Sequence, residues 1–300
     1  HMDQLPVGDP TLSAKEIVGN ESQERMGIVI REEDIEHIRQ IADRERAPFY
    51  VVGETTGDHR FVFEQTDGVK PIDLAMEDMF GKAPRTIMTD KTVEETYEDV
   101  TYDQTQLDEY VERVLQLEAV ACKDWLTNKV DRSVTGKIAR QQCQGEIQLP
   151  LSDCGVVALD YRGRAGIATS IGHAPQAALV DPAAGSVLSI AEALTNIVWA
   201  PLSEGLDSVS LSANWMWPCK NEGEDARLYR AVEACSDFAC SLGINIPTGK
   251  DSLSMTQKYG KDKVYSPGTV IISAGAEVSD IRKVVSPVLR TGIDSTVYYI

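Results

Sequence analysis

Three residues in the second half of the chain are of the types that could hold a hard cation. Glu192 and Asn196 lie four residues apart in DPAAGSVLSIAEALTNIVWA (181–200), so on a helix their side chains share one face, one turn apart. Asp153 lies at the end of an expected strand and can join them only through the fold. Mg²⁺ prefers such oxygen ligands. The alternatives are a turn carboxylate for Asp153 and an ordinary solvated face for the helix.

A second group of chemically able residues stands just after a short expected strand at 244–246. Its members are Gly249, Lys250, Asp251 and Ser252. In a loop, their backbone N–H groups, ammonium and hydroxyl would converge, an arrangement that suits a phosphate. The segment is not a Walker A loop, because that motif needs two glycines separated by four residues before the lysine. A surface turn is the alternative interpretation.

Two further polar positions flank expected elements. NESQER (20–25) precedes an expected buried strand at 26–30, so it could bind a polar ligand or merely cap the preceding helix. His173, in SIGHAP, lies just ahead of the segment 181–200, and a lone histidine is more often structural than catalytic. No nucleophile with an adjacent base stands out in the sequence.

The segment 181–200 must position the first group, and both of its ends are encoded. Asp181 is a good N-cap, Pro182 suits the first helical position, and Pro201 cannot continue the helix. An apolar stripe at three- and four-residue spacing is expected to face a core: Val187, Ile190, Ala191, Leu194 and Val198. The opposite stripe is Gly185, Ser189, Glu192 and Asn196. It carries one charge, so we expect a helix buried on both sides with its polar groups aimed at a metal ion or a domain interface.

The remaining pattern alternates strands and helices, which indicates an α/β (α+β) fold. Further helices are expected at 32–46, with Ile35, Ile38 and Ile41 on one face, at 76–80 and at 225–242. Strands are expected at 26–30, 49–52, 60–64, 147–151, 155–161, 165–171, 208–213, 244–246 and 268–276. SANWMWPCKNEGED (212–225) is expected to be a loop. The acidic stretch from 84 to 128 is interpreted as a linker that ends in a helix near 107–117.

Bulk composition narrows the function classes. Three hundred residues, 42% of them apolar, are typical of about two globular domains. The net charge of -18 argues against nucleic acid as a partner, because phosphate-backbone binding needs clustered Lys and Arg. No apolar run is long enough to cross a membrane, and the six cysteines form no C-x-x-C pair, so we expect a cytoplasmic protein with reduced thiols. His1-Met2 resembles a tag remnant and the chain ends in an apolar run, which suggests a fragment.

Several segments together resemble the large, single-chain form of phosphoribosylformylglycinamidine synthase, also called formylglycinamide ribonucleotide amidotransferase. They are GDPTLSAKEIVGNESQERM, DRSVTGKIARQQCQGE, LSDCGVVAL, SIAEALTNIVWA, SLSANWMWPCKNEGEDARLYRAV and IPTGKDSLSM. The resemblance implies a carbon–nitrogen ligase of purine biosynthesis. That family converts formylglycinamide ribonucleotide, ATP and glutamine to the amidine, ADP, phosphate and glutamate; ATP phosphorylates the amide oxygen, and ammonia from a glutaminase domain displaces the phosphate.

The resemblance also implies a domain plan: two partial domains of the aminoimidazole-ribonucleotide-synthetase-like superfamily joined by a linker. Residues 3–88 would be the C-terminal part of the first synthetase half's α/β domain, and 89–129 the acidic linker. Residues 130–285 would be the barrel-forming N-terminal domain of the second half, and 286–300 the start of the next domain. The fragment alone is expected to be inactive, and its unpaired barrel edges are expected to favour self-association.

Site residues follow from the resemblance motif by motif. Glu21, Ser22, Gln23 and Ser252 are implied as contacts to formylglycinamide ribonucleotide. Ser152, Gly249, Lys250 and Asp251 are implied near nucleotide. Asp153, Glu192 and Asn196 match positions that hold Mg²⁺ on a tightly held ADP at an auxiliary site, and His173 is a degenerate counterpart of the family's histidine motif. No catalytic residue is expected within the fragment.

Two alternatives remain open at this stage. One is another ATP-binding member of the same superfamily, such as aminoimidazole ribonucleotide synthetase. The other is a non-catalytic scaffold module that only holds nucleotide. The partners expected for the parent protein are formylglycinamide ribonucleotide, ATP, glutamine-derived ammonia and the remaining domains of the same chain.

Overall fold

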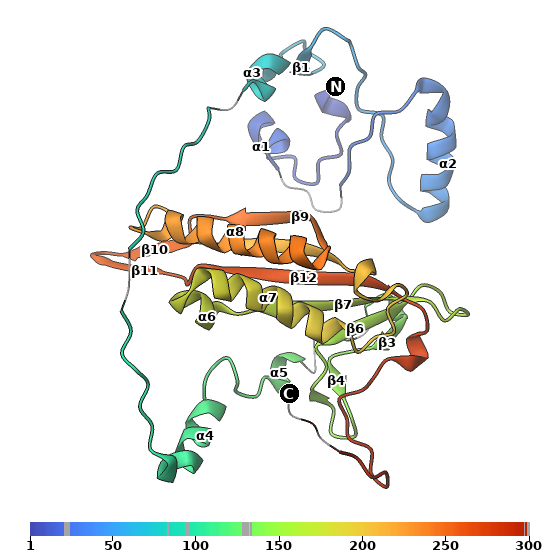
Figure 1. The fold of residues 1–300 in the computed structure, drawn as a ribbon. Coiled ribbons are helices and arrows are strands. Elements are labelled where there is room, and N and C mark those ends of the chain that lie inside the picture. The colour runs from blue at the N-terminus through green and yellow to red at the C-terminus, as the bar shows by residue number, and fades with distance from the viewer. Residues whose placement is uncertain are drawn as a thin grey trace. The chain divides into compact units, whose positions relative to one another are not determined.

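The computed structural model describes residues 1–20, 25–82, 84–93, 96–127, 132, 134–296 and 298. They form two compact units, 1–87 and 88–300 (Figure 1). In the described ranges, no helix is both long and apolar enough to cross a bilayer.

The first unit contains three short or medium helices and one strand pair. The helices are α1 (Ala14–Val18), α2 (Ile35–Glu45) and α3 (Met76–Phe80), and the antiparallel pair is β1 (Arg60–Phe63) with β2 (Ile72–Ala75). The predicted helices at 32–46 and 76–80 and the strand at 60–64 are therefore confirmed within a few residues. The turn that begins at Asp67 joins the two strands, with the Asp67 carboxylate accepting the N–H of Val69 at 3.0 Å.

Two predicted strands of this unit are wrong. Residues 26–30 and 49–52 belong to no hydrogen-bonded ladder among the described residues. A strand exists only beside a partner strand, and here the apolar side chains stay in solvent, with Met26 88% and Val29 82% exposed. The sequence pattern identified an extended apolar segment but could not identify its neighbour.

The second unit is built on a six-stranded sheet with the order β3-β6-β7-β12-β8-β9. Neighbouring strands are antiparallel except β8 and β9, which run parallel. The strands are β3 (Ile138–Arg140), β6 (Cys154–Ala158), β7 (Gly166–His173), β8 (Ser210–Met216), β9 (Asn245–Ser252) and β12 (Thr269–Val278). Two small hairpins lie beside it, β4 (Cys143–Gln144) with β5 (Leu149–Pro150) and β10 (Thr256–Tyr259) with β11 (Asp262–Tyr265).

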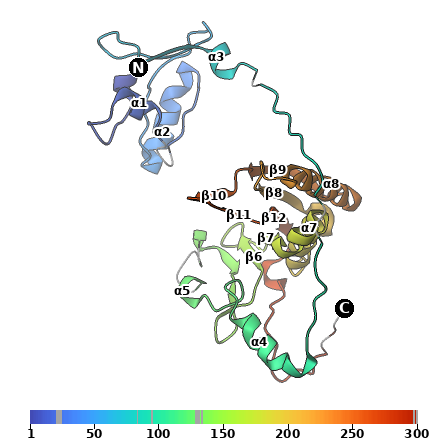
Figure 2. The same ribbon diagram turned by 90° about the vertical axis from the view of Figure 1, so that its left-hand side faces the viewer.

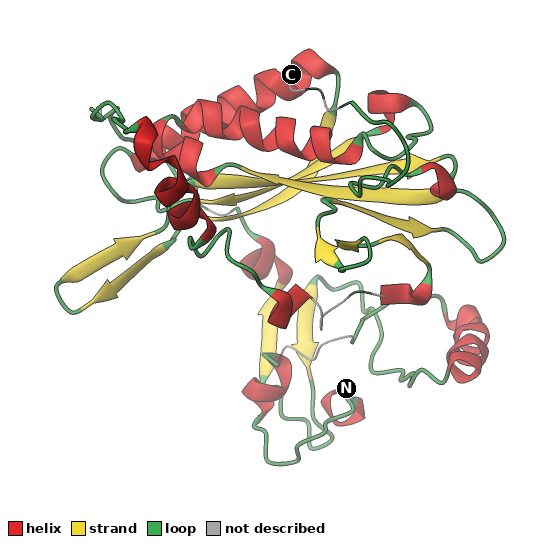
Figure 3. Cartoon of the chain, turned by 90° about the horizontal axis from the view of Figure 1, so that it is seen from below, coloured by secondary structure: helices red, strands yellow, loops and turns green. Residues whose placement is uncertain are grey.

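Helices cover one face of this sheet. The two long ones, α7 (Pro182–Ile197) and α8 (Glu224–Leu242), lie side by side on it, and the short α6 (Pro175–Val180) packs against α7 (Figures 2 and 3). The main core forms between these layers and includes fully buried Ile190, Ile197 and Ile272. α4 (Leu107–Leu115) and α5 (Asp124–Thr127) precede the sheet in the chain, and α4 confirms the helix predicted near 107–117.

The central helix α7 begins and ends where predicted, but its buried face differs. Asp181 caps it by accepting the N–H of Ala183 at 2.9 Å. The buried side chains are Pro182, Gly185, Ser186, Ser189, Ile190, Ala193, Leu194 and Ile197, whereas Val198 and Glu192 are exposed. The prediction of a helix buried on both sides is therefore wrong for this chain. Small residues turn inward because α7 approaches β7 closely: a Cβ added at Gly172 would lie 1.9 Å from the Ser189 carbonyl oxygen.

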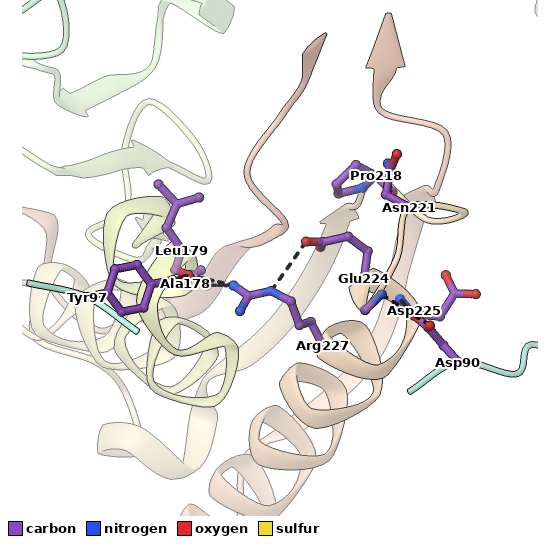
Figure 4. A network of polar contacts seen from close by, with 10 residues as sticks. Asp90, Tyr97, Ala178, Leu179, Pro218, Asn221, Glu224, Asp225 and Arg227 are labelled. Carbon is purple, nitrogen blue, oxygen red and sulfur yellow. Dashed lines mark hydrogen bonds and ion pairs between the residues drawn. The ribbon is translucent and has the colours of Figure 1, made fainter. Parts of the chain in front are cut away.

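The first residues of the second unit, just after residue 87, contact the start of α8 (Figure 4). The Asp90 carboxylate accepts the N–H groups of Gly223 at 3.2 Å and Asp225 at 3.1 Å, at the start of α8. Lys91 pairs with Glu222 at 2.7 Å. Since Gly223 itself supplies no side-chain cap to α8, a residue more than 130 positions away in the sequence caps this helix.

A second contact fastens the same segment to α6. The Tyr97 hydroxyl donates to the Leu179 carbonyl at 2.9 Å, and Arg227 of α8 donates to the carbonyls of Ala178 and Leu179 at 2.6 and 2.8 Å. Figure 4 shows Arg227 reaching between this helix end and Glu224. The C-terminal end of α6 is thus tied to α8 and to the chain ahead of the sheet.

Candidate functional site

The GKDS segment lies inside a strand and not in a loop, which corrects the prediction. Residues 249–252 are the second half of β9, the edge strand that pairs with β8. Lys250 and Ser252 are two residues apart, so their side chains share one face of the sheet, and the Lys250 ammonium donates to the Ser252 hydroxyl at 3.1 Å. The cation and the hydroxyl do converge, but a strand rather than a glycine-rich loop presents them.

Gly249 serves the close approach of two strands. A Cβ at this position would lie 2.2 Å from the carbonyl oxygen of Ala213, which pairs with it in β8. The glycine is therefore required by strand packing in this structure. A hollow of about 320 Å³ lies beside it, lined by Trp215 of β8 and by Thr248, Lys250 and Asp251 of β9.

The neighbouring strand contributes a polar side chain that the sequence did not single out. Asn214 pairs in register with Lys250 on one side and with Ile271 on the other. Its Oδ1 atom is buried and accepts no hydrogen bond within the described part of the chain. The segment 212–216 belongs to β8, so the predicted loop 212–225 begins only at Trp217; alternation of polar and apolar residues from Ser210 onward could have signalled the longer strand.

Glu192 and Asn196 project from α7 onto the end of β7. The Glu192 carboxylate accepts the N–H of His173, and the Asn196 amide group donates to the Ile171 carbonyl at 3.0 Å. These two contacts bring both predicted side chains to the same strand end. Each keeps an oxygen that makes no hydrogen bond here among the described residues, namely the second Glu192 carboxylate oxygen and the Asn196 carbonyl oxygen.

Asp153 approaches this strand end from the other side. It is exposed and directly precedes β6, whose first residue, Cys154, pairs with Ser170 of β7, so continued antiparallel pairing places Asp153 beside Ile171. The backbone of Asp153 therefore reaches the strand end that Glu192 and Asn196 contact, but Ile171, its neighbour in β7, faces away from α7, and no contact joins Asp153 to the other two side chains among the described residues. The described residues include no group of three or more His, Cys, Asp or Glu side chains in a metal-binding arrangement. A set of two carboxylates and one amide oxygen nevertheless has the chemistry of a Mg²⁺ site.

The remaining predicted site residues are Ser152, His173 and the stretch 21–23. Ser152 is half-buried and donates its hydroxyl to the Cys154 carbonyl at 3.1 Å, so in this structure it shapes the turn into β6. His173 is exposed, and its backbone N–H contacts Glu192. Glu21, Ser22 and Gln23 lie outside the described residues.

Two family models match separate parts of the chain. Residues 122–277 match the family described as FGAR-AT PurM_N-like domain, and residues 1–65 match the C-terminal domain of AIR synthase related proteins. These matches confirm the predicted fold class.

Two curated relatives extend along almost the whole chain. The phosphoribosylformylglycinamidine synthase of Dictyostelium discoideum is 37% identical over 315 residues, covering 100% of this chain. That of Homo sapiens is 39% identical over 307 residues, covering 97% of this chain. In both cases this chain spans 23% of the relative's length.

Solved structures share the fold at low sequence identity. PurLQS from Thermotoga maritima aligns over 96% of this chain and 43% of its own with a TM-score of 0.64 and 17% identity. T. maritima PurL complexed with ATP aligns over 96% of this chain and 43% of its own with a TM-score of 0.59 and 18% identity. The complex of T. maritima PurL with FGAR covers 96% of this chain and 42% of its own, with a TM-score of 0.56 and 17% identity.

Proposed function

Since the chain belongs to the FGAR-AT PurM_N-like domain family, we propose that it is part of an ATP-dependent ligase that makes formylglycinamidine ribonucleotide from formylglycinamide ribonucleotide and glutamine. The observation that carries the proposal is the similarity to two phosphoribosylformylglycinamidine synthases over 97% or more of this chain. The parent works in the cytoplasm, in keeping with the six free cysteines. The fragment alone is inactive, because the parent's other domains complete the site.

The proposed substrate contacts lie along β9. Ser252 contacts formylglycinamide ribonucleotide together with Glu21, Ser22 and Gln23, which lie outside the described residues, and Gly249, Lys250 and Asp251 border the nucleotide. Three features support this: the Lys250–Ser252 hydrogen bond, the adjacent hollow, and the buried, unpaired Asn214 oxygen on the next strand. Lys250 supplies a positive charge that would stabilise phosphate oxygens.

The proposed metal site lies at the same end of the strands as residues 249–252, since the register aligns His173 of β7 with Ile271, Asn214 and Lys250. Asp153, Glu192 and Asn196 hold Mg²⁺ on an ADP molecule, with Ser152 beside the nucleotide. When bound, the ion would neutralise phosphate charge. The support is that Glu192 and Asn196 of α7 contact the backbone at the end of β7, and that Asp153, just ahead of β6, lies next to this strand end in the chain pairing. The role is structural, so the ion and its ADP stabilise the domain and do not turn over.

The test of the activity compares the fragment with its parent. With formylglycinamide ribonucleotide, ATP and ammonia, the parent is expected to form the amidine and the 300-residue chain to form none. Amidine formed by the isolated chain would contradict the proposal that other domains of the parent are needed to complete the site. A parent that binds nucleotide but forms no amidine with glutamine or ammonia would favour the scaffold alternative.

The test of the metal site uses Glu192→Gln in the parent, with Glu204→Gln, an exposed acid of a loop, as the matched control. Glu192→Gln is expected to lower both the melting temperature and the amount of ADP retained on purification, whereas Glu204→Gln leaves both unchanged. A stable, ADP-loaded but inactive Glu192 variant would place this residue in the active site instead.

The face of the sheet opposite the helices is the proposed pairing surface. It carries exposed Ile167 and Ile171, the latter 58% exposed, on the same side of β7. In the parent this face pairs with the corresponding domain of the other synthetase half; in the isolated chain it pairs with a second copy. Sedimentation should show dimers at high concentration that Ile171→Asp disrupts, and a clean monomer at high concentration would refute self-association.

A further inference from the structure

A polar pocket near the start of the second unit contains two arginines. Arg132 and Arg140 line a cavity of about 390 Å³ together with Gln141, Gln144 and Gln148. The walls come from β3 and the β4–β5 hairpin. Arg132, Arg140, Gln141 and Gln144 lie in the segment DRSVTGKIARQQCQGE, but none of them is assigned a role from the sequence, and the site on β9 does not include them.

Within the described part of the chain, no acidic side chain balances the positive charge in this pocket. Arg132 donates through Nε to the Gln141 side-chain oxygen at 2.9 Å and through Nη2 to that of Gln148 at 2.7 Å. Arg140 donates through Nη1 to Gln144 at 2.8 Å and through Nη2 to the Val284 carbonyl at 2.9 Å. All four acceptors are neutral, and no carboxylate lines the pocket among the described residues. In a chain with a net charge of -18, two guanidinium groups paired only with amide oxygens form a local positive site.

The glutamines that hold these arginines are themselves fixed. Gln144, which is 9% exposed, donates its amide group to the Gln141 carbonyl at 2.6 Å, and Gln148 donates to the Gly145 carbonyl at 2.7 Å. The guanidinium groups therefore lie in set positions before any ligand arrives, which lowers the ordering cost of binding.

One buried donor of these two arginines has no acceptor among the described residues. The Nε–H of Arg140 is buried and makes no hydrogen bond within the described part of the chain. A buried donor without an acceptor is destabilising. The acceptor that best meets both the free donor and the unbalanced charge is an anion with several oxygens, because guanidinium groups bind such groups through paired hydrogen bonds.

We propose that this pocket binds the phosphate group of a small molecule, with Arg132 and Arg140 as its ligands. A phosphate presents oxygens in several directions and so can meet two guanidinium groups that come from different parts of the chain. The cavity also has room for more than a free phosphate ion, which favours a phosphate monoester. The proposal depends on the pocket alone and not on the role proposed for β9.

The test measures binding of two probes to the 300-residue chain by titration calorimetry: inorganic phosphate and glycerol 3-phosphate. Tighter binding of the ester would identify an esterified phosphate as the ligand, and tighter binding of the free ion would identify phosphate itself. Either supports the proposal if the variants below weaken it.

Arg132→Gln removes one ligand, and Gln148→Glu keeps the arginine but gives it an internal carboxylate partner. Each should weaken binding roughly tenfold, the loss expected for one charge-assisted hydrogen bond. Arg162→Gln, at an exposed loop position, should leave binding unchanged. Arg140 is not the main variant, because its hydrogen bond to the Val284 carbonyl also contributes to the fold. Circular dichroism on each variant checks that it is folded.

Three outcomes would overturn the proposal. The first is that neither probe binds the wild-type chain. The second is that the Arg132 and Gln148 variants bind as well as the wild type. The third is that binding is lost in Lys250→Gln but kept in those two variants, which would place the phosphate on β9.

Discussion

Helices α2 and α7 present similar sequence patterns but have different surroundings. Both carry isoleucines at helical spacing; the pattern predicts one apolar face for α2 and burial on both sides for α7. In α7, Ile190 and Ile197 are fully buried between the helix and the sheet. In α2, Ile35 and Ile38 are only half-buried, and Ile41 is 37% exposed.

The same contrast holds for the two units as wholes. Among the described residues of the first unit, Met2 is the one buried hydrophobic side chain, whereas the second unit contains the main core. An apolar stripe therefore shows that a helix needs a partner, but it does not show that the chain at hand supplies one. The chain spans 23% of the length of its relatives, so we infer that other segments of the parent cover the first unit.

The largest expected effect tests whether the second unit is held by the α7–β7 contact. Gly172→Ala places a Cβ 1.9 Å from the Ser189 carbonyl oxygen, a backbone atom that cannot move aside cheaply. We expect a loss of more than about 4 kcal/mol in the free energy of unfolding. Urea unfolding followed by thiol labelling measures it, because all six cysteines lie in the second unit.

The reporter for this experiment is Cys235. Burial raises the pKa of its thiol to about 11, so it reacts only when the second unit opens. Gly275→Ala is the matched control: it lies in β12 of the same sheet and an added Cβ meets nothing within 4 Å. Similar losses in the two variants would show that the close approach of α7 to β7 is unimportant.

The second effect compares the two helices directly. Ile190→Ala leaves a cavity in a closed core and should cost about 3 kcal/mol in the free energy of unfolding. Ile38→Ala removes the same atoms from a half-buried position in α2, so we expect less than about 1 kcal/mol. Urea unfolding of each variant provides the measurement. Equal costs would mean that the first unit has a core as closed as that of the second.

Much of the second unit could be predicted from local chemistry. Asp181, Pro182 and Pro201 encode the ends of α7, and Gly243 ends α8 in a left-handed conformation, as its position suggested. The face that α7 buries could not be predicted, since it depends on how closely the helix packs on Gly172 of β7, which the helical pattern itself does not show. The predicted loop at 249–252 is wrong for a related reason. Proline and glycine at 247–249 favour a turn locally, but pairing with β8 extends the strand through these residues.

For the candidate site, too, local sequence predicted some features, whereas others depended on tertiary packing. Helical spacing alone predicted that Glu192 and Asn196 share a face, and both do contact β7. Bringing Asp153 to the same strand end required the pairing of β6 with β7, which no local pattern reveals. Arg132 and Arg140 lie in a segment that carries the family resemblance, but their pocket could not be predicted, because β3 and the β4–β5 hairpin form it only in the folded chain.

The smallest expected effect concerns the acidic stretch, which was interpreted as a linker but caps α8 through Asp90. Hydrogen bonds from backbone N–H groups, first that of Lys91 and then those of Gly223 and Asp225, lower the pKa of the Asp90 carboxyl below its usual value. A carboxyl whose pKa is lowered on folding adds stability above its unfolded pKa, and this stability is lost as the pH falls through the folded value. Asp90→Asn should therefore lower the melting temperature slightly at pH 7.

The pH dependence decides between a cap and a coincidental contact. The difference in melting temperature between wild type and Asp90→Asn should be constant at neutral pH and shrink below about pH 4, the unfolded pKa of an aspartate. Asp99→Asn, a change at an exposed position of the same segment, should show no difference at any pH. If Asp90→Asn behaves like Asp99→Asn, the contact with α8 contributes nothing, and the stable part of the second unit begins after the acidic segment. If the difference follows the expected pH course, residues near 90 belong to the folded second unit because they satisfy the first N–H groups of its longest helix.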